Sequence, residues 1–211
     1  MTPLNSPWDL QIHGGLLFVA MAGAHQIWMI DLLRRLAFPY AGSGREARID
    51  GGLDDAAFAQ PSGLTIGNGV LYVADSESNI VRAIDLPPTN QVRTIAGGDL
   101  FEFGDRDGRG DAARFQHPLG IVSARGVLYV ADTYNHRIRT VSPGTGDVRV
   151  FAGIGTEGLE DGPAPVARFH EPGGITATSD ALFVADTNNH AIRRVWLNDG
   201  SCMTLEIVDQ A

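Results

Sequence analysis

The sequence predicts an all-β protein, a β-propeller of about four blades with four antiparallel strands in each blade. A segment of the form Leu-Tyr/Phe-Val-Ala-Asp begins at Leu71, Leu128 and Leu182, and a degenerate copy runs from Leu17 to Met21. A proline-led segment precedes each copy, and the successive prolines are 54, 57 and 54 residues apart. Each unit also holds four short β-rich segments. This period is slightly longer than the roughly 40–50 residues of common propeller repeats.

The first element of each unit is the proline-led segment, which we expect to begin the innermost strand of a blade. The four copies are Pro7-Trp-Asp-Leu, Pro61-Ser-Gly-Leu, Pro118-Leu-Gly-Ile and Pro172-Gly-Gly-Ile. The second element is apolar on both pleat faces, as in residues 70–74, whereas a strand with one face in water alternates apolar and polar residues. Each sheet is therefore expected to be covered on both faces by neighbouring blades.

The third and fourth elements follow a short polar turn. Third strands are expected at residues 27–30, 81–84, 138–141 and 192–195, and fourth strands at 92–97 and 148–153. No segment has a sustained helical period. Residues 31–36 could form one turn of helix, but the repeat places a strand and a loop there.

The connectors between units keep a constant spacing. Asp-Gly pairs that begin at Asp50, Asp107 and Asp161 each lie eight residues before a phenylalanine, and each phenylalanine lies three residues before the next proline. A constant spacing predicts connectors that are packed against the blades. The predicted blades are residues 4–58, 59–115, 116–169 and 170–211.

Composition excludes several classes of protein. The 211 residues include 16 basic and 25 acidic side chains, a net charge of −9, and 44% are apolar, so the chain is not a disordered tail. No nucleic-acid partner is expected, because phosphate binding needs a basic surface. The single cysteine, Cys202, excludes an intramolecular disulfide. The N-terminus has no signal-peptide pattern and no apolar run is long enough to span a membrane, which predicts a soluble, cytoplasmic chain without a membrane partner.

Two segments resemble a known repeat family. Asp132-Thr-Tyr-Asn-His136 and Asp186-Thr-Asn-Asn-His190 resemble the NHL repeat, named for Asn-His-Leu, although Arg137 and Ala191 replace its leucine. Residues 57–64 and 116–120 resemble more specifically the family that joins a thioredoxin-like domain to an NHL propeller. That resemblance runs from about residue 4 to residue 195 and implies a six-bladed ring, of which this chain corresponds to the last four blades.

Four blades from a six-bladed ring would leave one apolar sheet face uncovered at each end. Three alternatives follow from this resemblance. The chain is a fragment of a longer gene product, or the four blades close as a smaller ring, or two copies associate head to tail as a homo-oligomer.

Two sets of repeated polar residues invite a functional interpretation. Asp75, Asp132 and Asp186 occupy one place in successive units, but a carboxylate at a strand end is expected to accept backbone N–H bonds from the following turn. The first unit has Met21 there, which a symmetric metal ring would not tolerate. His136 and His190 align with His25 and Asn79 and are likewise expected to be structural turn residues. No metal site is predicted.

Residues that differ between units are better candidates for a binding site. The two positions before each repeat proline, with Asp9 from the first inner strand, are expected to meet at one mouth of the central channel. The hypothetical ligand-binding residues are Asp9, Gln60, His117, His170 and Glu171. The alternative is that these residues belong to connectors that face water. The acidic loop 99–111 lacks the EF-hand register, because Gln116 stands at the twelfth position, and a structural role is expected for it.

The function expected from these observations is a non-catalytic scaffold that binds an unidentified protein partner or a small ligand, with no cofactor and no catalytic residue. Catalysis is the less favoured interpretation. Its form would be a propeller enzyme of lactonase or lyase type with a divalent metal at the channel mouth, since six-bladed propellers of similar shape include such enzymes.

Overall fold

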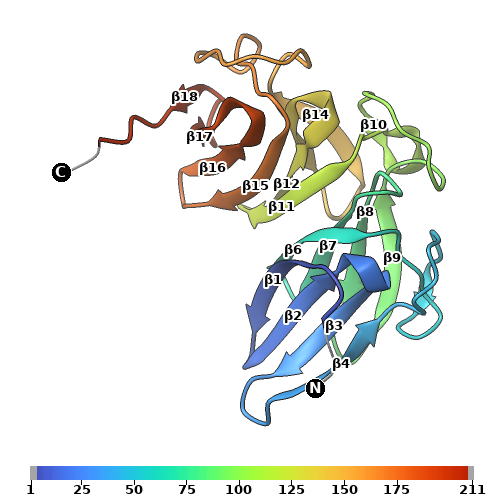
Figure 1. Ribbon diagram of the computed structural model, residues 1–211. Coiled ribbons are helices and arrows are strands. Elements are labelled where there is room, and N and C mark those ends of the chain that lie inside the picture. The colour runs from blue at the N-terminus through green and yellow to red at the C-terminus, as the bar shows by residue number, and fades with distance from the viewer. Residues whose placement is uncertain (1–3, 209–211) are drawn as a thin grey trace.

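A computed structural model describes residues 4–208 of the chain. It confirms the all-β prediction, because four antiparallel sheets form the four blades of a β-propeller (Figure 1). Blade 1 consists of β1 (Pro7–His13), β2 (Leu16–Met21), β3 (Gln26–Asp31) and β4 (Leu36–Ala41). Blade 2 consists of β6 (Pro61–Gly67), β7 (Val70–Asp75), β8 (Ile80–Asp85) and β9 (Gln91–Ala96).

Blade 3 consists of β11 (Pro118–Ala124), β12 (Val127–Asp132), β13 (Arg137–Val141) and β14 (Asp147–Ala152). Blade 4 consists of β15 (Pro172–Ala177), β16 (Ala181–Asp186), β17 (Ala191–Trp196) and β18 (Cys202–Thr204). Short connector strands, β5 (Gly51–Gly52) and β10 (Gly108–Arg109), pair with the outer strands of blades 2 and 3. Each proline-led segment begins an innermost strand, as the repeat predicted.

The inner strands β1, β6, β11 and β15 lie in sequence around the centre of the arc (Figure 1). Their close approach explains the glycine two residues after the prolines of blades 2 and 3, Gly63 and Gly120. A Cβ atom on Gly63 would lie 2.4 Å from the carbonyl oxygen of Leu119, and one on Gly120 would lie 2.3 Å from that of Gly173. Only glycine lets neighbouring inner strands come this close.

Apolar side chains fill the three boundaries between successive blades. Each boundary includes one phenylalanine from the connector, Phe58, Phe115 or Phe169, and all three rings are fully buried. The connectors are therefore packed against the sheets, as their constant spacing predicted. Fixed connectors also fix how each blade sits against the next.

The blades form an open arc, in which β1 and β15 do not lie beside each other (Figure 1). The structure therefore corrects two expectations. The four blades do not close as a smaller ring, and only blades 2 and 3 are covered on both faces. On the free face of blade 1, Leu10 and Ile12 are 58% and 62% exposed. Ile192 and Met203 are partly exposed on the free face of blade 4. Within residues 4–208, no helix has the length and apolar character needed to cross a membrane.

Candidate functional site

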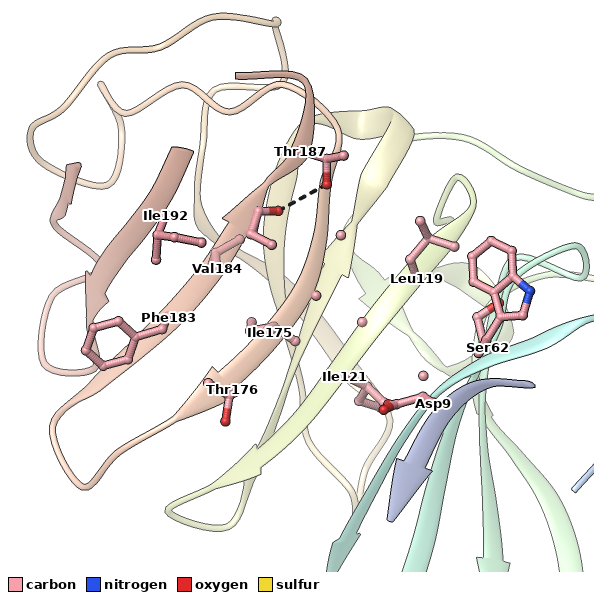
Figure 2. A pocket seen from close by; sticks show the side chains of 16 residues that line it. Asp9, Ser62, Leu119, Ile121, Ile175, Thr176, Phe183, Val184, Thr187 and Ile192 are labelled. Carbon is pink, nitrogen blue, oxygen red and sulfur yellow. Dashed lines mark hydrogen bonds between the residues drawn. The ribbon is translucent and has the colours of Figure 1, made fainter. Parts of the chain in front are cut away.

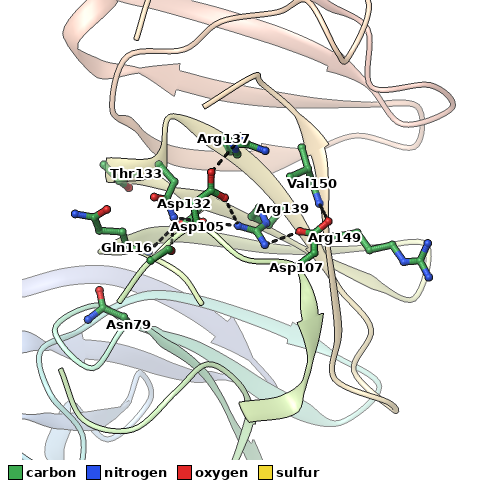
Figure 3. A network of polar contacts seen from close by, with 12 residues as sticks. Asn79, Asp105, Asp107, Gln116, Asp132, Thr133, Arg137, Arg139, Arg149 and Val150 are labelled. Carbon is green, nitrogen blue, oxygen red and sulfur yellow. Dashed lines mark hydrogen bonds and ion pairs between the residues drawn. The ribbon is translucent and has the colours of Figure 1, made fainter. Parts of the chain in front are cut away.

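A buried arginine joins each of blades 2, 3 and 4 to the connector before it. In blade 3, Nη1 of Arg139 lies 3.1 Å from Oδ2 of Asp132, and Nη2 lies 2.6 Å from Oδ1 of Asp107 (Figure 3). The guanidinium carbon lies 5.6 Å from the centre of the Phe115 ring. Arg82 and Arg193 make the same contacts in blades 2 and 4. A fully buried cation thus has two carboxylates and an aromatic ring as partners.

The aspartates Asp75, Asp132 and Asp186 accept other hydrogen bonds besides those from the arginines. Their Oδ1 atoms accept the backbone N–H of Ala59, Gln116 and His170, at 2.8, 2.7 and 2.7 Å. The backbone donor thus comes from the incoming connector and not, as expected, from the following turn. That turn contributes side chains instead, from Ser78, Asn135 and Asn189. In blades 2, 3 and 4, one carboxylate therefore connects the incoming connector to the turn after the second strand.

In blade 1, uncharged residues stand in place of both the buried arginine and its aspartate. Met21 stands at the aspartate position and Trp28 at the arginine position, so both charges are absent together. The equivalent backbone N–H, that of Asn5, lies 3.3 Å from the sulfur atom of Met21.

The aligned residues His25, Asn79 and His136 join successive blades across the top of the arc. Nδ1 of His25 accepts the backbone N–H of Gln60 at 3.3 Å, and Nδ1 of His136 accepts that of Glu171 at 3.1 Å. In blade 2 the side-chain oxygen of Asn79 accepts the N–H of His117 at 2.7 Å. Within residues 4–208, no hydrogen bond is made by the His190 imidazole of blade 4.

The five residues expected at the channel mouth do not form one pocket. Asp9 lines the channel, whereas His117 stacks on Tyr134, with ring centres 4.7 Å apart. Glu171 accepts a bond from Asn188 at 2.8 Å, and His170 lies 3.4 Å from Glu157. Gln60, His117 and Glu171 have φ angles of 57°, 52° and 51°, which turn each N–H toward the preceding blade. Each residue therefore lies over its own blade boundary, and the predicted convergence is corrected.

The channel holds a cavity of about 570 Å³ (Figure 2). Its wall is mostly glycine backbone and apolar side chains, with polar groups from Asp9, Ser62, Thr176 and Thr187. Asp9 stands where blades 2, 3 and 4 have glycine, and its two oxygens accept the N–H groups of Leu10 and Leu64, both at 2.8 Å. Burial raises the pKa of Asp9, and the two backbone bonds oppose this rise. This carboxylate therefore tethers β1 to β6.

The acidic connector and the cysteine also have structural surroundings. Asp105 lies 3.1 Å from both Arg137 and Arg139, so its carboxylate is paired (Figure 3). No three His, Cys, Asp or Glu side chains within residues 4–208 are placed to hold a metal ion together. Burial raises the pKa of the Cys202 thiol to about 12, so it is not ionised at neutral pH.

A second depression, missed by the sequence analysis, lies over the boundary between blades 2 and 3. This aromatic cleft, of about 330 Å³, is lined by Glu77, Asn79, Phe101, Phe103, His117 and Tyr134, among others. One signal in the sequence could have revealed it. Asp107 follows Gly97 by ten positions, whereas Asp50 follows Gly42, and Asp161 follows Gly153, by eight. The two extra residues lie in the connector that carries Phe101 and Phe103.

Comparisons with known proteins agree with this architecture. The family model of the NHL repeat matches residues 115–140. The chain is 42% identical to Protein SUPPRESSOR OF QUENCHING 1, chloroplastic, of Arabidopsis thaliana over 97% of its length. It is 39% identical to human NHL repeat-containing protein 2 over 90% of its length. It spans only 21% and 31% of these two relatives.

Solved structures share the fold at low sequence identity. An auxiliary nutrient binding protein from Bacteroides thetaiotaomicron aligns with 90% of this chain, which covers 46% of that protein, at a TM-score of 0.69 and 22% identity. A streptogramin B lyase aligns with 100% of this chain, which covers 72% of the lyase, at a TM-score of 0.57 and 13% identity. Likenesses at these identities show the propeller fold alone.

Proposed function

The chain is an NHL-repeat β-propeller homologous to NHL repeat-containing protein 2, and on this premise we propose that it is a non-catalytic scaffold that binds a protein partner. In a protein of the thioredoxin-like/NHL type, these four blades would contribute recognition. A small ligand in the channel cavity is the other form that such binding would take.

One observation carries this proposal. The repeated ionisable groups with catalytic potential, Asp75, Asp132 and Asp186, are fully buried and bonded to arginines or to the backbone. The channel carboxylate, Asp9, is likewise bonded to two backbone N–H groups. Gln60, His117 and Glu171 differ between blades and are partly exposed. They lie beside the turns that join the second and third strands, on the face of the arc that we call the loop face. Variable side chains on a rigid repeated framework are typical of recognition surfaces.

The test is site-specific photo-crosslinking in cells of the source organism. A photoreactive residue replaces Tyr134 at the loop face, and in a matched control it replaces Arg149 on the outer strand β14. We expect one protein to crosslink from position 134 but not from position 149, and the purified protein to bind the chain saturably. The proposal fails if the two positions give the same products.

The enzyme alternative is an outcome of a parallel assay. The purified chain is incubated with Ca²⁺, Mg²⁺ or Zn²⁺ and with simple lactones and esters. Turnover that depends on the metal and disappears in an Asp9→Asn variant would replace the scaffold proposal by a catalytic one. If the chain binds these compounds but does not convert them, the result supports the scaffold proposal.

The cytoplasmic location stays a prediction. The Arabidopsis relative is named as a chloroplastic protein. Fractionation of the source cells, followed by detection of the chain with an antibody, will determine the compartment.

A further inference from the structure

Three aromatic side chains that are about half or more exposed to water gather in the aromatic cleft. Phe101, Phe103 and Tyr134 are 55%, 64% and 47% exposed. Single exposed apolar residues are ordinary on protein surfaces, but several that line one concave site mark a place where something binds. The packing of the blades does not require these rings, since each boundary between blades already has its buried connector phenylalanine.

Non-repeated residues build this cleft. Tyr134 and Glu77 occupy the same position of the turn in successive blades, where the other two blades have Gly23 and Asn188. Phe101 and Phe103 come from the connector that is two residues longer than its counterparts. The Tyr134 ring is held by the His117 imidazole, which stacks on it at an interplanar angle of 10°. The turn of blade 2, the turn of blade 3 and the lengthened connector thus meet at one point.

The charge of the cleft is negative. The Glu77 carboxylate is half-exposed, and its Oε1 atom lies 3.7 Å from Nδ1 of His117. Burial lowers the pKa of His117, although Glu77 and Glu171 oppose this effect, so the imidazole is neutral at neutral pH. Neither arginine nor lysine lines the cleft, and Glu77 therefore has no cationic partner there.

We propose that the aromatic cleft binds an arginine side chain of the protein partner, with its guanidinium against the aromatic rings and its charge beside Glu77. This inference deepens the proposed scaffold function and rests on it. Guanidinium groups stack on aromatic faces and pair with carboxylates in a way that suits this combination of residues.

The same chain uses this chemistry in its interior. Arg82, Arg139 and Arg193 each lie over a phenylalanine ring and against carboxylates. At the free face of blade 4, Arg194 lies 3.6 Å from the centre of the Trp196 ring. The cleft offers the aromatic and acidic parts of this arrangement and lacks the arginine.

The test is an NMR titration of the purified chain with two short peptides, acetyl-Gly-Arg-Gly-amide and the same peptide with citrulline. Citrulline has the shape of arginine but no charge. We expect the arginine peptide to shift the ring signals of Tyr134 and to bind about three- to tenfold more tightly than the citrulline peptide. The proposal is overturned if the two peptides bind equally or if neither binds saturably at millimolar concentration.

Three variants assign the binding to the cleft. Glu77→Gln removes the charge at constant shape and is expected to abolish the preference for arginine over citrulline. Phe103→Ser is expected to weaken binding of the arginine peptide about threefold or more. Leu159→Ser, at an exposed position of the next connector, is the matched control and leaves binding unchanged. Equal binding by all three variants overturns the assignment, and their thermal unfolding verifies that each is folded.

The crosslinking experiment separates this inference from the scaffold function. If the partner found from position 134 still binds the Glu77→Gln variant with unchanged affinity, the arginine site is wrong while the scaffold function stands. If no partner crosslinks at position 134 but the arginine peptide binds, the cleft stands and the protein-scaffold proposal fails.

Discussion

The buried Arg139 requires acidic residues at the positions that surround it. A fully buried charge is very unfavourable unless it is paired, and Arg139 has Asp132, Asp105 and Asp107 as partners. Blade 1 lacks the arginine and the aspartate together, with Met21 and Trp28 in their places. This joint replacement leaves no fully buried carboxylate at that place in blade 1 without a cation, whereas replacing Arg139 alone would leave Asp132 in that state.

A variant pair in blade 3 tests this interdependence. Arg139→Met leaves the fully buried Asp132 without its cation, and we expect a loss of about 3–5 kcal/mol in the free energy of unfolding. Asp132→Met combined with Arg139→Met removes both buried charges, which are also absent together in blade 1, and is expected to lose less than the single variant. Urea denaturation followed by circular dichroism measures both. A double variant that is less stable than Arg139→Met would contradict the prediction.

At the scale of the structural elements, stability comes from the boundaries between blades. The side chains of His25, Asn79 and His136 each accept one backbone N–H from the next blade. Ser76 and Thr133 donate to the carbonyl oxygens of Pro118 and Pro172, at 2.8 and 2.9 Å. In blade 4, the Thr187 hydroxyl bonds to Ala185 of its own blade instead (Figure 2). The turn between the second and third strands thus bonds to the next blade at each boundary inside the arc. In blade 4, where no further blade follows, the same turn makes no such contact within residues 4–208.

His136 and His190 occupy equivalent positions, and only His136 bonds to a following blade within residues 4–208, so the pair tests whether this bond stabilises the boundary. His136→Ala removes the acceptor for the Glu171 N–H and is expected to lower the free energy of unfolding by about 0.5–1.5 kcal/mol more than His190→Ala does. Both residues have left-handed backbone, with φ angles of 53° and 52°, so the backbone penalty of alanine is matched. His136→Asn is expected to be close to the unchanged chain, since Asn79 performs this role in blade 2. Equal losses in the two alanine variants would show that the bond contributes nothing.

The inner strands allow a second comparison between equivalent positions. In Gly120→Ala the new Cβ would lie 2.3 Å from the carbonyl oxygen of Gly173, so blades 3 and 4 must separate. In Gly174→Ala the nearest atom is the Cβ of Ala185 at 3.8 Å, an ordinary contact. We expect a large decrease in melting temperature for Gly120→Ala and little change for Gly174→Ala. Similar melting temperatures would mean that the inner strands are not held at this distance.

At the scale of the whole molecule, the dominant feature is the open arc with its two free sheet faces. Trp8, Leu10 and Ile12 on β1 are each more than half exposed. At the other end, Phe183, Ala185 and Ile192 line one side of the channel cavity. Interior boundaries of this same chain bury equivalent apolar residues, so contact with a further blade would remove both faces from water.

We therefore expect residues 1–211 by themselves to associate head to tail, blade 4 of one copy against blade 1 of the next. Light scattering after size exclusion is expected to give a mass above the 22.5 kDa of one chain. Leu10→Asp with Ile12→Asp should return the mass to that of a monomer, whereas Leu33→Asp, at a turn outside this face, should not. A monomer that unfolds cooperatively without substitutions would rule out this association.

Four features could be read from the sequence alone: the period, the all-β class, the order of strands within each blade and the packing of the connectors. These features could be predicted because each is repeated, so that the spacing of proline, Val-Ala-Asp and phenylalanine is visible without coordinates. The resemblance to the NHL repeat rests on the same repeated residues. Periodicity, however, describes only what the blades have in common.

The way in which the non-repeated residues meet, and the open form of the arc, could not be predicted from the sequence. His117 lines the aromatic cleft and Asp9 lines the channel cavity, although the sequence pattern predicted one shared pocket. The same packing brings Glu77, Phe101 and Tyr134 together from three segments. The physical reason is that side-chain direction and blade curvature follow from contacts between distant segments, whereas a repeated pattern reflects the local requirements of one blade.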